Sequence, residues 1–448
     1  MTDETRTATL SLHGGGDTEP LGLVIAYHRD PRYEGSGRIL PAGETLVLGR
    51  SCTSFAPGAW NDSRVSRRHA SVARLGSELT FRDLDSRNGT FVDGERCPRG
   101  PLRVGQVLSV GRVVLVVQRF PGKNPRRVES DLVGVSSAMA EALDLVDRVA
   151  SRDLPVLILG ESGTGKELIA RKVHECSRRP GRFVPVNCAG VPDTLLQDEL
   201  FGHVRGAFSG AEATRRGLVE EARRGTLFLD EIGDASLTLQ GSLLRLLQER
   251  EVRAIGSDRS TTVDVRFVAA TNARLADDVR SGDFREDLYA RLNRIVVRIP
   301  PLRERREDVM PLARHFAQQF SGRSLGFETN LAQALVLHDW PGNARSLQGV
   351  VERLVLEQEG EDTLTSPTWL AEELSSHARR GGPAPEATAE PTPNPRREVD
   401  GEELRSLLVR HSGKVTAVAS ELGIGRNTLY RWLRRYDISL DEYREEEP

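Results

Sequence analysis

A glycine-rich segment between an apolar run and a helical pattern constrains this fold most strongly. The run VLIL leads into GESGTGKE, residues 160–167, which continues into the helical pattern ELIARKVHECS. In this strand, loop and helix setting, G-x-x-x-x-G-K is typical of a loop whose backbone N–H groups cradle phosphates while Lys166 reaches the β and γ oxygens. The alternative is a glycine-rich turn with a solvated lysine. We expect ATP to bind through Gly160, Glu161, Ser162, Gly163, Thr164, Gly165, Lys166 and Glu167.

Further apolar runs end in polar residues of matching chemistry. The runs FVPVN, TLFLD and RFVAATN alternate with helical patterns, which indicates an α/β domain with a parallel sheet. Asp230 follows one run and is expected to hold Mg²⁺ through water, while Glu231 polarises the attacking water. The alternative is a pair of solvated acids at a strand end. Thr271 or Asn272, at the end of another run, can touch the γ-phosphate or that water.

Basic residues further along suggest two more roles. Hydrolysis leaves negative charge on the transferring phosphoryl group, which an arginine can stabilise. FREDLYARLN offers Arg285 and Arg291, which we expect to reach the nucleotide of a neighbouring subunit; the alternative is surface salt bridges with Glu286 and Asp287. Arg345 of WPGNARSLQ is a candidate for a small helical lid over ATP.

Composition divides the chain into several domains. The 448 residues carry a net charge of only −3, so nucleic-acid binding must come from a local patch. No run of 18 apolar residues occurs and the N-terminus is polar, which favours a cytoplasmic protein without a membrane partner; four scattered cysteines are interpreted as reduced thiols. We predict domains at 20–119 (an all-β sandwich), 132–304 (α/β), 305–372 (a helical lid), 373–400 (a Pro/Ala-rich linker) and 401–439 (all-α).

The two terminal domains carry polar and basic side chains suited to phosphates. Short apolar runs at 8 to 12 residue spacing predict the N-terminal sandwich, whose loops LVLGR, VSRRHA and DSRNGTF offer Arg, Ser and Asn donors; the alternative is ordinary polar turns. The C-terminal segment reads as a helix-turn-helix with a basic second helix suited to a major groove; the alternative is a solvated helical tail. Arg426 and Asn427 could read bases, with phosphate contacts from the other arginines. The candidate DNA-binding residues are Arg426, Asn427, Thr428, Arg431, Arg434 and Arg435, and the residues expected to pack the small core are Val418, Leu422, Leu429 and Leu433.

The central motifs, taken in order, resemble a known family. GESGTGKELIA, FVPVNCAG, ELFGHVRGAFSGA, GTLFLDEIGD, FREDLYARLN, PPLRERRED and WPGNARSL, within residues 132–356, are similar to the AAA+ ATPase core of the sigma-54-dependent transcription activators. In that family Glu normally follows the loop lysine, which accounts for Glu167 where other such loops have Ser or Thr. The resemblance implies a ring, usually a hexamer, with Arg285 and Arg291 acting in trans. It also implies that Asn187 pairs with Glu231 and switches with the γ-phosphate.

The segment GAFSGA matches the family's G-A-F-T-G-A loop. The resemblance implies that this loop grips the sigma-54 factor of RNA polymerase holoenzyme at a closed promoter, with Phe208 as an apolar contact. The alternative is a loop whose Phe208 tucks into its own core. Ser209 stands where the family has Thr, so we expect retained but weaker coupling to sigma-54. The loop comprises Gly206, Ala207, Phe208, Ser209, Gly210 and Ala211.

The terminal domains also resemble known modules. The pattern GR…SRxH…S-x-N-G-T is similar to the forkhead-associated (FHA) domain, which binds phosphothreonine peptides, over about residues 22–118. The resemblance implies that Arg50 and Ser66 hold the phosphate and that Asn88 bonds the peptide backbone, with Arg67 and Arg87 flanking the site. His69 and Gly89 are interpreted as bracing residues. The C-terminal segment resembles the Fis-type DNA-binding domain of the same activator family.

Together these features predict a transcription activator. It would bind double-stranded DNA upstream of a promoter, hydrolyse ATP with Mg²⁺ to open the sigma-54 complex, and take its input from a phosphothreonine protein or a Ser/Thr kinase. One rival is a DNA-binding regulator or repressor whose ATPase only sets the oligomeric state. Another is a phosphopeptide-binding adaptor with a vestigial motor, against which the complete loop, Asp230, Glu231 and both arginines argue.

Overall fold

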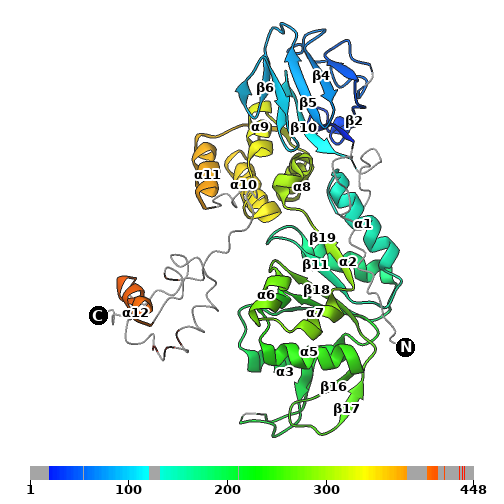
Figure 1. Ribbon diagram of the computed structural model, residues 1–448, viewed down its shortest axis with the longest axis vertical. Coiled ribbons are helices and arrows are strands. Elements are labelled where there is room, and N and C mark those ends of the chain that lie inside the picture. Colours follow the sequence, from blue (N-terminus) through cyan, green and yellow to red (C-terminus); the bar gives the residue numbers. More distant parts are fainter. Residues whose placement is uncertain are drawn as a thin grey trace. The chain divides into compact units, whose positions relative to one another are not determined.

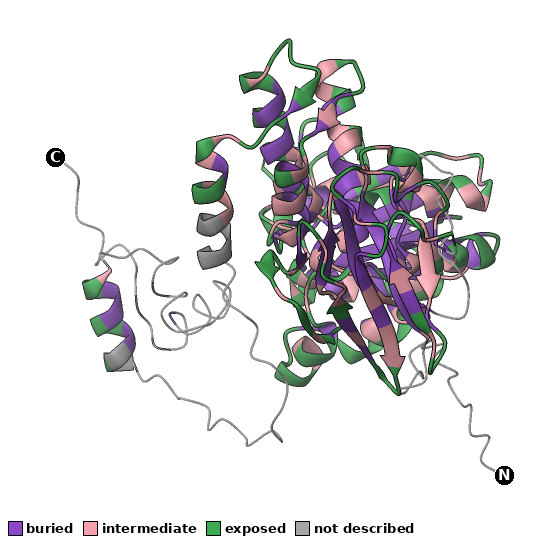
Figure 2. Ribbon diagram, turned by 90° about the horizontal axis from the view of Figure 1, so that it is seen from above, coloured by how far each residue is buried: buried purple, intermediate pink, exposed green. Residues whose placement is uncertain are grey.

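The computed structural model describes most of the chain as two units. The described residues are 20–53, 55–120, 132–209, 211–380, 401–411 and four single positions, 418, 433, 436 and 438. One unit spans Met1–Gly382 and the other Pro383–Pro448 (Figure 1). Buried residues concentrate in the strands and along one side of most helices (Figure 2). Across these described ranges, no helix is long and apolar enough to cross a membrane.

The first unit begins with the all-β sandwich that the spacing of apolar runs predicts. Its two sheets have the strand orders β2-β1-β10-β9-β6-β7 and β3-β4-β5-β8, and neighbouring strands pair antiparallel. Leu23, Leu48, Trp60 and Leu115 lie in the core between the sheets. The strands are β1 (Leu21–Tyr27), β2 (Gly37–Ile39), β3 (Thr45–Leu48), β4 (Ala70–Leu75), β5 (Glu78–Asp83), β6 (Thr90–Val92), β7 (Glu95–Arg96), β8 (Arg99–Leu102), β9 (Val107–Val110) and β10 (Val113–Arg119), with a short 3₁₀ helix η1 at Pro31–Tyr33.

The central domain is a five-stranded parallel sheet with helices on both faces. Its order is β12-β15-β18-β11-β19, and every neighbouring pair is parallel. Figure 1 labels three of these strands, β18, β11 and β19. The strands are β11 (Val156–Leu159), β12 (Phe183–Asn187), β15 (Thr226–Asp230), β18 (Arg266–Thr271) and β19 (Ile295–Arg298). The helices are α1 (Ser137–Val149), α2 (Lys166–Ser177), α3 (Asp193–Phe201), α4 (Leu218–Glu221), η2 (Ile232–Asp234), α5 (Leu237–Glu249), α6 (Leu275–Ser281) and α7 (Glu286–Leu292).

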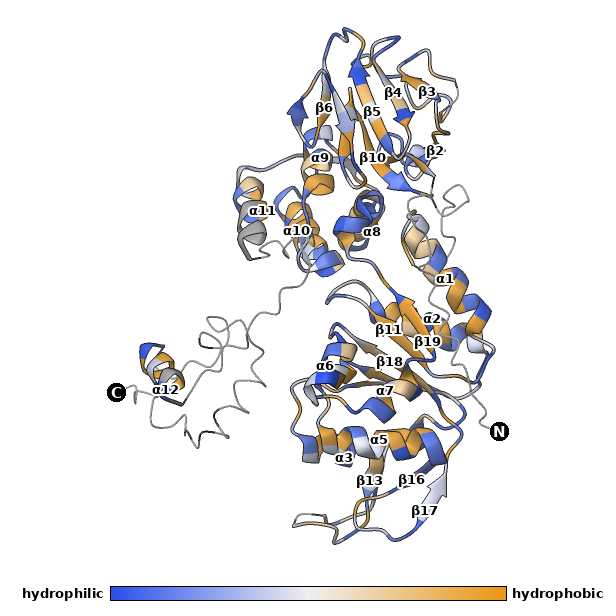
Figure 3. Ribbon diagram, in the orientation of Figure 1, coloured by the Kyte–Doolittle hydropathy of each residue, from blue (hydrophilic) through white to orange (hydrophobic). Residues whose placement is uncertain are grey.

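Alternate residues of the central strands face different helices, which explains why these strands are apolar throughout. Ile158 packs with residues of α1 and α2, whereas Leu157 packs with residues of α3, α5 and α7. Strands buried on both faces carry continuous apolar runs, and Figure 3 shows β11, β18 and β19 mainly in hydrophobic colours. This architecture confirms the α/β fold expected for the centre of the chain. Polar residues after these strands meet at the carboxyl edge of the sheet, where such folds bind ligands.

The central domain also contains two small antiparallel hairpins outside its parallel sheet. β13 (Gly202–His203) pairs with β14 (Arg215–Arg216), and β16 (Glu251–Arg253) pairs with β17 (Ser260–Thr262). A backbone bridge joins His203 to Ile255, so the hairpins lie side by side. The segment 206–211 extends from the first hairpin.

A helical lid follows the central domain and ends later than expected. Its elements are η3 (Leu302–Glu304), η4 (Arg306–Asp308), α8 (Val309–Ser321), β20 (Gly326–Phe327), α9 (Thr329–Leu337), α10 (Asn343–Glu357), β21 (Thr363–Leu364) and α11 (Thr368–Arg380). The composition predicts that the linker starts at residue 373, but α11 crosses that position. The physical reason is that TWLAEELSSHARR contains no Gly or Pro, and the Gly/Pro-rich run begins only at Gly381.

Little of the second unit is described. Helix α12 spans Gly401–Arg410, and Val418 and Leu433 are buried, in keeping with the core role expected for them. Leu422 and Leu429 lie outside the described residues, as do all six candidate DNA-binding residues.

Candidate nucleotide site, contact loop and phosphate pocket

The glycine-rich loop lies between β11 and α2 and contacts the lid. Gly163 has φ +77° and Gly165 has φ +101°, a left-handed backbone that glycine adopts without strain. A Cβ atom on Gly163 would lie 2.2 Å from the carbonyl oxygen of Gly342, so only glycine lets the lid backbone approach the loop this closely. The loop is therefore shaped by both of its neighbours, the helix that follows it and the lid.

Lys166 joins the loop to the acidic end of β15. Its Nζ donates to the carbonyl oxygen of Gly160 at 3.1 Å and to Oε1 of Glu231 at 2.8 Å. The other carboxylate oxygen of Glu231 accepts the backbone N–H of Asn272 at 3.0 Å. The side chain of Lys166 is only 7% exposed, so its ammonium needs a buried anionic partner. Glu231 supplies that partner and spans from β15 to the end of β18.

The side chain of Asn187 bonds within its own segment in this structure while Glu231 pairs with Lys166, so the switch that the family resemblance implies stays a prediction. Its register partner across the sheet is Asp230, but its side-chain oxygen accepts the N–H of Ala189 at 2.9 Å. The physical reason is that a carboxylate beside a buried ammonium gains more from the ion pair than from a neutral amide. Asn187 thus lies opposite Asp230 in the sheet, but its side chain bonds within a local turn.

Asp230 ends β15 with a carboxyl group that is partly buried at the edge of the sheet. Partial burial, and then the nearby charge of Glu231, raises the pKa of its carboxyl group. A cation next to Asp230 would reverse that effect, and carboxylate oxygen is a ligand that Mg²⁺ prefers. The described residues contain no group of three or more His, Cys, Asp or Glu side chains able to hold a metal. One or two carboxylates with nucleotide phosphates are the usual Mg²⁺ arrangement, so the residues present fit this ion.

The two polar residues at the end of β18, Thr271 and Asn272, differ in how far their side chains are exposed to solvent. Thr271 is buried and its hydroxyl accepts the N–H of Ala273 at 3.0 Å, whereas the side chain of Asn272 is exposed at the edge of the sheet. The sequence left both open as γ-phosphate contacts. The geometry favours Asn272.

The lid holds the loop through residues that include the predicted Arg345. Nη1 of Arg345 donates to Oγ of Ser162 at 3.2 Å. The fully buried Asn343 donates to the carbonyl oxygen of Ser162 at 2.9 Å and accepts the N–H of Leu302 at 2.8 Å. The sequence motif predicts no role for Asn343, although this residue lies in the same WPGNARSL segment as Arg345. Its φ of +53° is the left-handed conformation that asparagine tolerates better than most residues.

Two arginines of the PPLRERRED motif also contact the loop, although neither is among the residues predicted from the sequence. Arg303 makes a two-bond ion pair with Glu161, at 2.6 and 2.8 Å. The buried Arg305 donates to the carbonyl oxygen of Thr164 at 3.0 Å and lies 3.6 Å from Asp308. A run of arginines directly after a strand that borders the loop is the signal that could have indicated these contacts.

The remaining charged candidates lie on the surface of the single chain. Arg285 pairs with Asp287 at 2.7 Å, which is the surface salt bridge weighed as its alternative role. Arg291, near the end of α7, is exposed. Glu167, at the start of α2, is exposed and pairs with Arg171 at 2.7 Å. None of these contacts joins the arginines to the loop of their own chain.

The segment 206–211 presents its phenylalanine to solvent. Phe208 is 47% exposed, and its ring lies edge-on to that of His203 with centroids 5.0 Å apart. Backbone bonds from Gly206 N to Ala211 O and from Ala211 N to Phe208 O close the loop at 2.9 and 3.0 Å. Gly210 lies outside the described residues. The geometry favours an exposed contact for Phe208 over the alternative in which it tucks into its own core.

The loops of the sandwich converge on a hollow of about 700 Å³. His69 is buried and braces the loops, accepting the N–H of Ser66 at 3.1 Å and lying 3.0 Å from the carbonyl oxygen of Gly89. The hydroxyl of Ser66 accepts the N–H of Arg87 at 3.2 Å, and the Asn88 amide donates to the carbonyl oxygen of Arg64 at 2.7 Å. The hollow is lined by Arg50, Ser51, Ser63, Arg64, Val65, Ser66, Arg67, Arg68, Asp85, Arg87 and Asn88.

All five residues expected at the phosphate thus line one hollow. Among its lining residues are five arginines and a single acid, Asp85. The excess of positive charge and the hydroxyl and amide donors suit a doubly charged anion. Arg64 and Arg68 are not among the predicted residues, although Arg68 directly follows Arg67 and Arg64 lies two positions before Ser66.

Family models match successive parts of the chain. The sigma-54 interaction domain matches residues 132–298, the AAA+ ATPase lid domain 303–387, the FHA domain 46–111, and the bacterial regulatory protein, Fis family, 395–436. The first three of these segments coincide with the domain that carries the glycine-rich loop, with the helical lid and with the sandwich, in that order.

Curated proteins and solved structures match over more than one domain. The transcriptional regulatory protein ZraR of Klebsiella oxytoca is 45% identical over 310 residues, covering 68% of each chain. The transcriptional regulatory protein GlrR of Escherichia coli is 40% identical over 334 residues, covering 73% of this chain and 72% of its own. NtrX from Brucella abortus in complex with ADP has 32% identity and a TM-score of 0.51, covering 68% of this chain and 70% of that one. The chain therefore belongs to the sigma-54-dependent transcriptional regulators, as an AAA+ ATPase with an FHA domain and a Fis-type helix-turn-helix domain.

Proposed function

We propose that this regulator uses ATP hydrolysis to remodel the sigma-54 RNA polymerase closed complex, and that Phe208 makes the contact. The observation that carries this proposal is the exposure of Phe208 on a loop continuous with the nucleotide site. β12 ends at Asn187, in register with Asp230; α3 then runs from Asp193 to Phe201 and leads into the loop. A single helix, α3, therefore connects the end of β12 to the loop that carries Phe208, so a movement at the end of β12 can be passed to this residue.

The residues of the nucleotide site have complementary tasks in hydrolysis. Lys166 and the loop N–H groups would bind the β- and γ-phosphates, which releases Glu231 from its ion pair. The freed carboxylate would then orient and polarise the attacking water, with Asn272 beside it. Asp230 is the residue proposed to hold Mg²⁺, which when bound supplies positive charge against the phosphate oxygens. Asn187 could receive the freed Glu231 carboxylate, as the family resemblance implies.

The arginines at α7 would complete the site from a neighbouring subunit. In the single chain Arg285 and Arg291 do not contact the glycine-rich loop, and Arg291 is exposed. We propose a closed ring, a hexamer as in the family, in which they stabilise the charge on the transferring phosphoryl group.

Replacing the exposed ring tests the sigma-54 contact. In Phe208→Ala we expect ATP hydrolysis to remain within about twofold of wild type, while open-complex formation on a sigma-54 promoter falls by at least about tenfold. Leu75→Ala is the matched control, since Leu75 is an exposed apolar residue on the sandwich. Wild-type protein that hydrolyses ATP but opens no complex would instead favour a DNA-binding regulator whose ATPase only sets the oligomeric state.

We also propose that the arginine-lined hollow binds a phosphothreonine segment of a protein partner or a Ser/Thr kinase. Arg50 and Ser66 would hold the phosphate, Asn88 the peptide backbone, and Arg67 and Arg87 the flanks. The charge-assisted bonds predict a loss of at least about tenfold in affinity for a phosphothreonine peptide in Arg50→Ala. Arg99→Ala is the control, on an exposed arginine outside the hollow. Equal binding of phosphorylated and unphosphorylated peptide to wild type would refute this assignment.

The C-terminal domain would address the regulator to double-stranded DNA upstream of its promoters. The match to the Fis family over 395–436 supports this proposal, and it would place the protein in the cytoplasm with its DNA and polymerase. The candidate base and phosphate contacts remain Arg426, Asn427, Thr428, Arg431, Arg434 and Arg435. Binding measured at 50 and 200 mM salt should weaken steeply as counterions are released, and a salt-independent affinity would count against phosphate contacts.

A further inference from the structure

The second face of one FHA sheet is buried. Every residue of β1 is buried, as are residues 113–117 of β10. Ile25 and Leu115 point into the core of the sandwich, whereas Ala26, Val114 and Val116 belong to a cluster with apolar residues of the lid. Sandwich strands with one face in water alternate apolar and polar residues, while a continuous apolar run indicates burial on both faces. The runs LGLVIAY and VVLVV therefore predict that a second apolar surface packs on the outer face of these strands, and in the structure that surface belongs to the lid.

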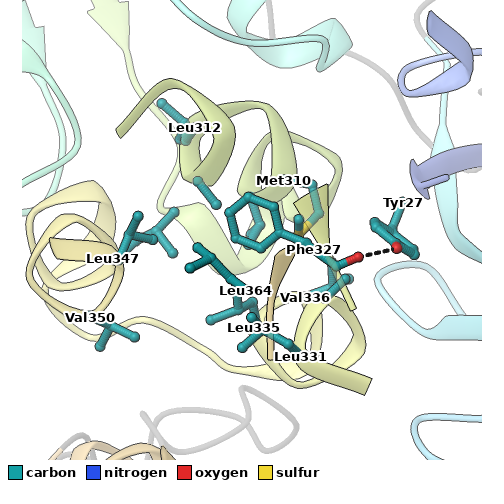
Figure 4. Close-up of a cluster of buried hydrophobic side chains, with 14 of the residues drawn as sticks. Tyr27, Met310, Leu312, Phe327, Leu331, Leu335, Val336, Leu347, Val350 and Leu364 are labelled. Atoms are coloured by element: carbon teal, nitrogen blue, oxygen red, sulfur yellow. Dashed lines mark hydrogen bonds between the residues drawn. The ribbon is translucent and has the colours of Figure 1, made fainter. Parts of the chain in front are cut away.

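Polar contacts fix the sheet on the lid. Tyr27 donates its hydroxyl to the carbonyl oxygen of Phe327 at 2.6 Å (Figure 4). Arg314 of α8 donates to the Glu34 carboxylate at 2.9 and 3.1 Å and to the carbonyl oxygen of His28 at 3.2 Å. Its guanidinium also lies 5.4 Å from the centre of the Phe327 ring. The Glu34 side chain is 3% exposed, so this ion pair is built into the interface and not a surface contact.

The same face is linked to the nucleotide loop through one short segment. Gln118 of β10 donates to the carboxyl group of the buried Glu307 at 2.6 Å. The next residue, Asp308, accepts the N–H groups of residues 135 and 136 at 2.6 and 2.8 Å. Three residues earlier, Arg305 donates to the carbonyl oxygen of Thr164 in the loop at 3.0 Å. The segment 305–308 thus contacts the FHA sheet on one side and the nucleotide loop on the other.

The phosphate hollow stays open in this arrangement. Two sets of FHA residues can be compared among the described ones: those that line the hollow and those that contact the lid. No residue belongs to both sets. The two places are joined through Asp62, whose oxygens accept the N–H of Arg64, in the hollow, at 3.0 Å and the N–H of Arg112, just before β10, at 3.1 Å. A ligand can therefore enter the hollow while the sheet stays on the lid.

We propose that the outer face of the β1–β10 pair is a docking surface for the lid of the same chain, and that the docked FHA domain strengthens nucleotide binding by holding segment 305–308 against the loop. Docking and nucleotide binding are linked, so each favours the other by the same factor. A consequence, which rests on the function proposed above, is that a ligand in the hollow can alter nucleotide affinity through the docked domain.

The docking is tested in the full-length chain with Val116→Lys, which puts a charge on the docked face. Leu75→Lys is the matched control, since it also replaces an aliphatic side chain with lysine but at an exposed strand position. We expect hydrogen exchange of backbone amides at 302–308 to quicken in Val116→Lys, with β4 and β5 still protected as a sign of a folded sandwich. We expect the dissociation constant for ADP to rise by at least about fivefold, and the control to match wild type.

Other outcomes separate docking from phosphate recognition. Unchanged exchange at 302–308 or an unchanged ADP affinity in a folded Val116→Lys protein would overturn the proposal. Tyr27→Phe removes only the hydroxyl that bonds to Phe327, so it should give a smaller change in the same direction. If Val116→Lys behaves as expected but wild type binds no phosphothreonine peptide, docking stands and the phosphate assignment fails.

Discussion

The ammonium of Lys166 is held 2.8 Å from the carboxylate of Glu231, so the residue expected to bind phosphate neutralises the residue expected to activate water. Bound phosphates would compete for Lys166 and free Glu231, which makes the base available only when nucleotide is present. The same contact explains why the carboxylate is not on Asn187.

We expect Glu231→Gln to bind ATP but to hydrolyse it at least about 100-fold more slowly, because the amide cannot accept the proton of water. Binding and turnover of the purified protein check this. Glu249→Gln, the same change on an exposed residue of α5, should behave as wild type. Wild-type turnover in Glu231→Gln would remove this residue from the mechanism.

Arg291→Ala should lower ATP hydrolysis by about 1,000-fold or more if the guanidinium stabilises the transferring phosphoryl group. Mixing it with Lys166→Ala subunits, which keep Arg291 but bind nucleotide poorly, should restore part of the activity, because mixed rings contain complete sites. Arg285→Ala can be tested in the same way. Mixtures no more active than their components would argue against action in trans.

The buried Glu307 makes the stability of the lid dependent on pH. Burial raises the pKa of its carboxyl group to about 8, with the Asp308 charge adding to the effect and Arg305 opposing it. The folded protein therefore binds this proton more tightly than the unfolded chain, so stability falls as pH rises from the ordinary glutamate range to about 8, by at most about 1.4 kcal/mol per pH unit, and then levels off. Unfolding midpoints at pH 6 and 8 measure the loss.

Glu307→Gln should flatten that pH dependence and leave the protein more stable than wild type at pH 8, since the amide resembles the neutral acid. Glu304→Gln, on an exposed neighbour, is the control. An equally steep fall in Glu307→Gln would assign the pH dependence to other groups.

Ser209→Thr restores the family residue in the contact loop, and we expect it to raise open-complex formation at equal ATP hydrolysis. The β-methyl group restricts χ1 and the backbone, so the loop holds its shape more often. Transcription from a sigma-54 promoter, normalised to hydrolysis, measures the coupling. The same output from Ser209→Thr and wild type would show that the serine does not weaken it.

Local patterns were sufficient to predict much of this protein. The loop at 160–167, the apolar run before it and the helix after it are consecutive in the chain, so spacing alone predicts the strand, loop and helix order that the structure shows there. The strand ends at Asp230 and Asn272 could be brought together because parallel strands share a carboxyl edge. The grouping of Ser66 with Asn88 was implied by the resemblance to the FHA domain, whose motif residues are spread over several loops.

What the sequence by itself determined was the order and type of the domains and which residues gather at the glycine-rich loop and at the arginine-lined hollow, because these depend on neighbouring residues and on strand edges. Only the tertiary structure decided that Lys166 pairs with Glu231, that Asn343 and Arg305 hold the loop, and that Val114 and Val116 pack on the lid. These contacts join residues from 65 to more than 180 positions apart. Periodicity shows that a strand face is buried but not what covers it, since many apolar surfaces would satisfy the same pattern.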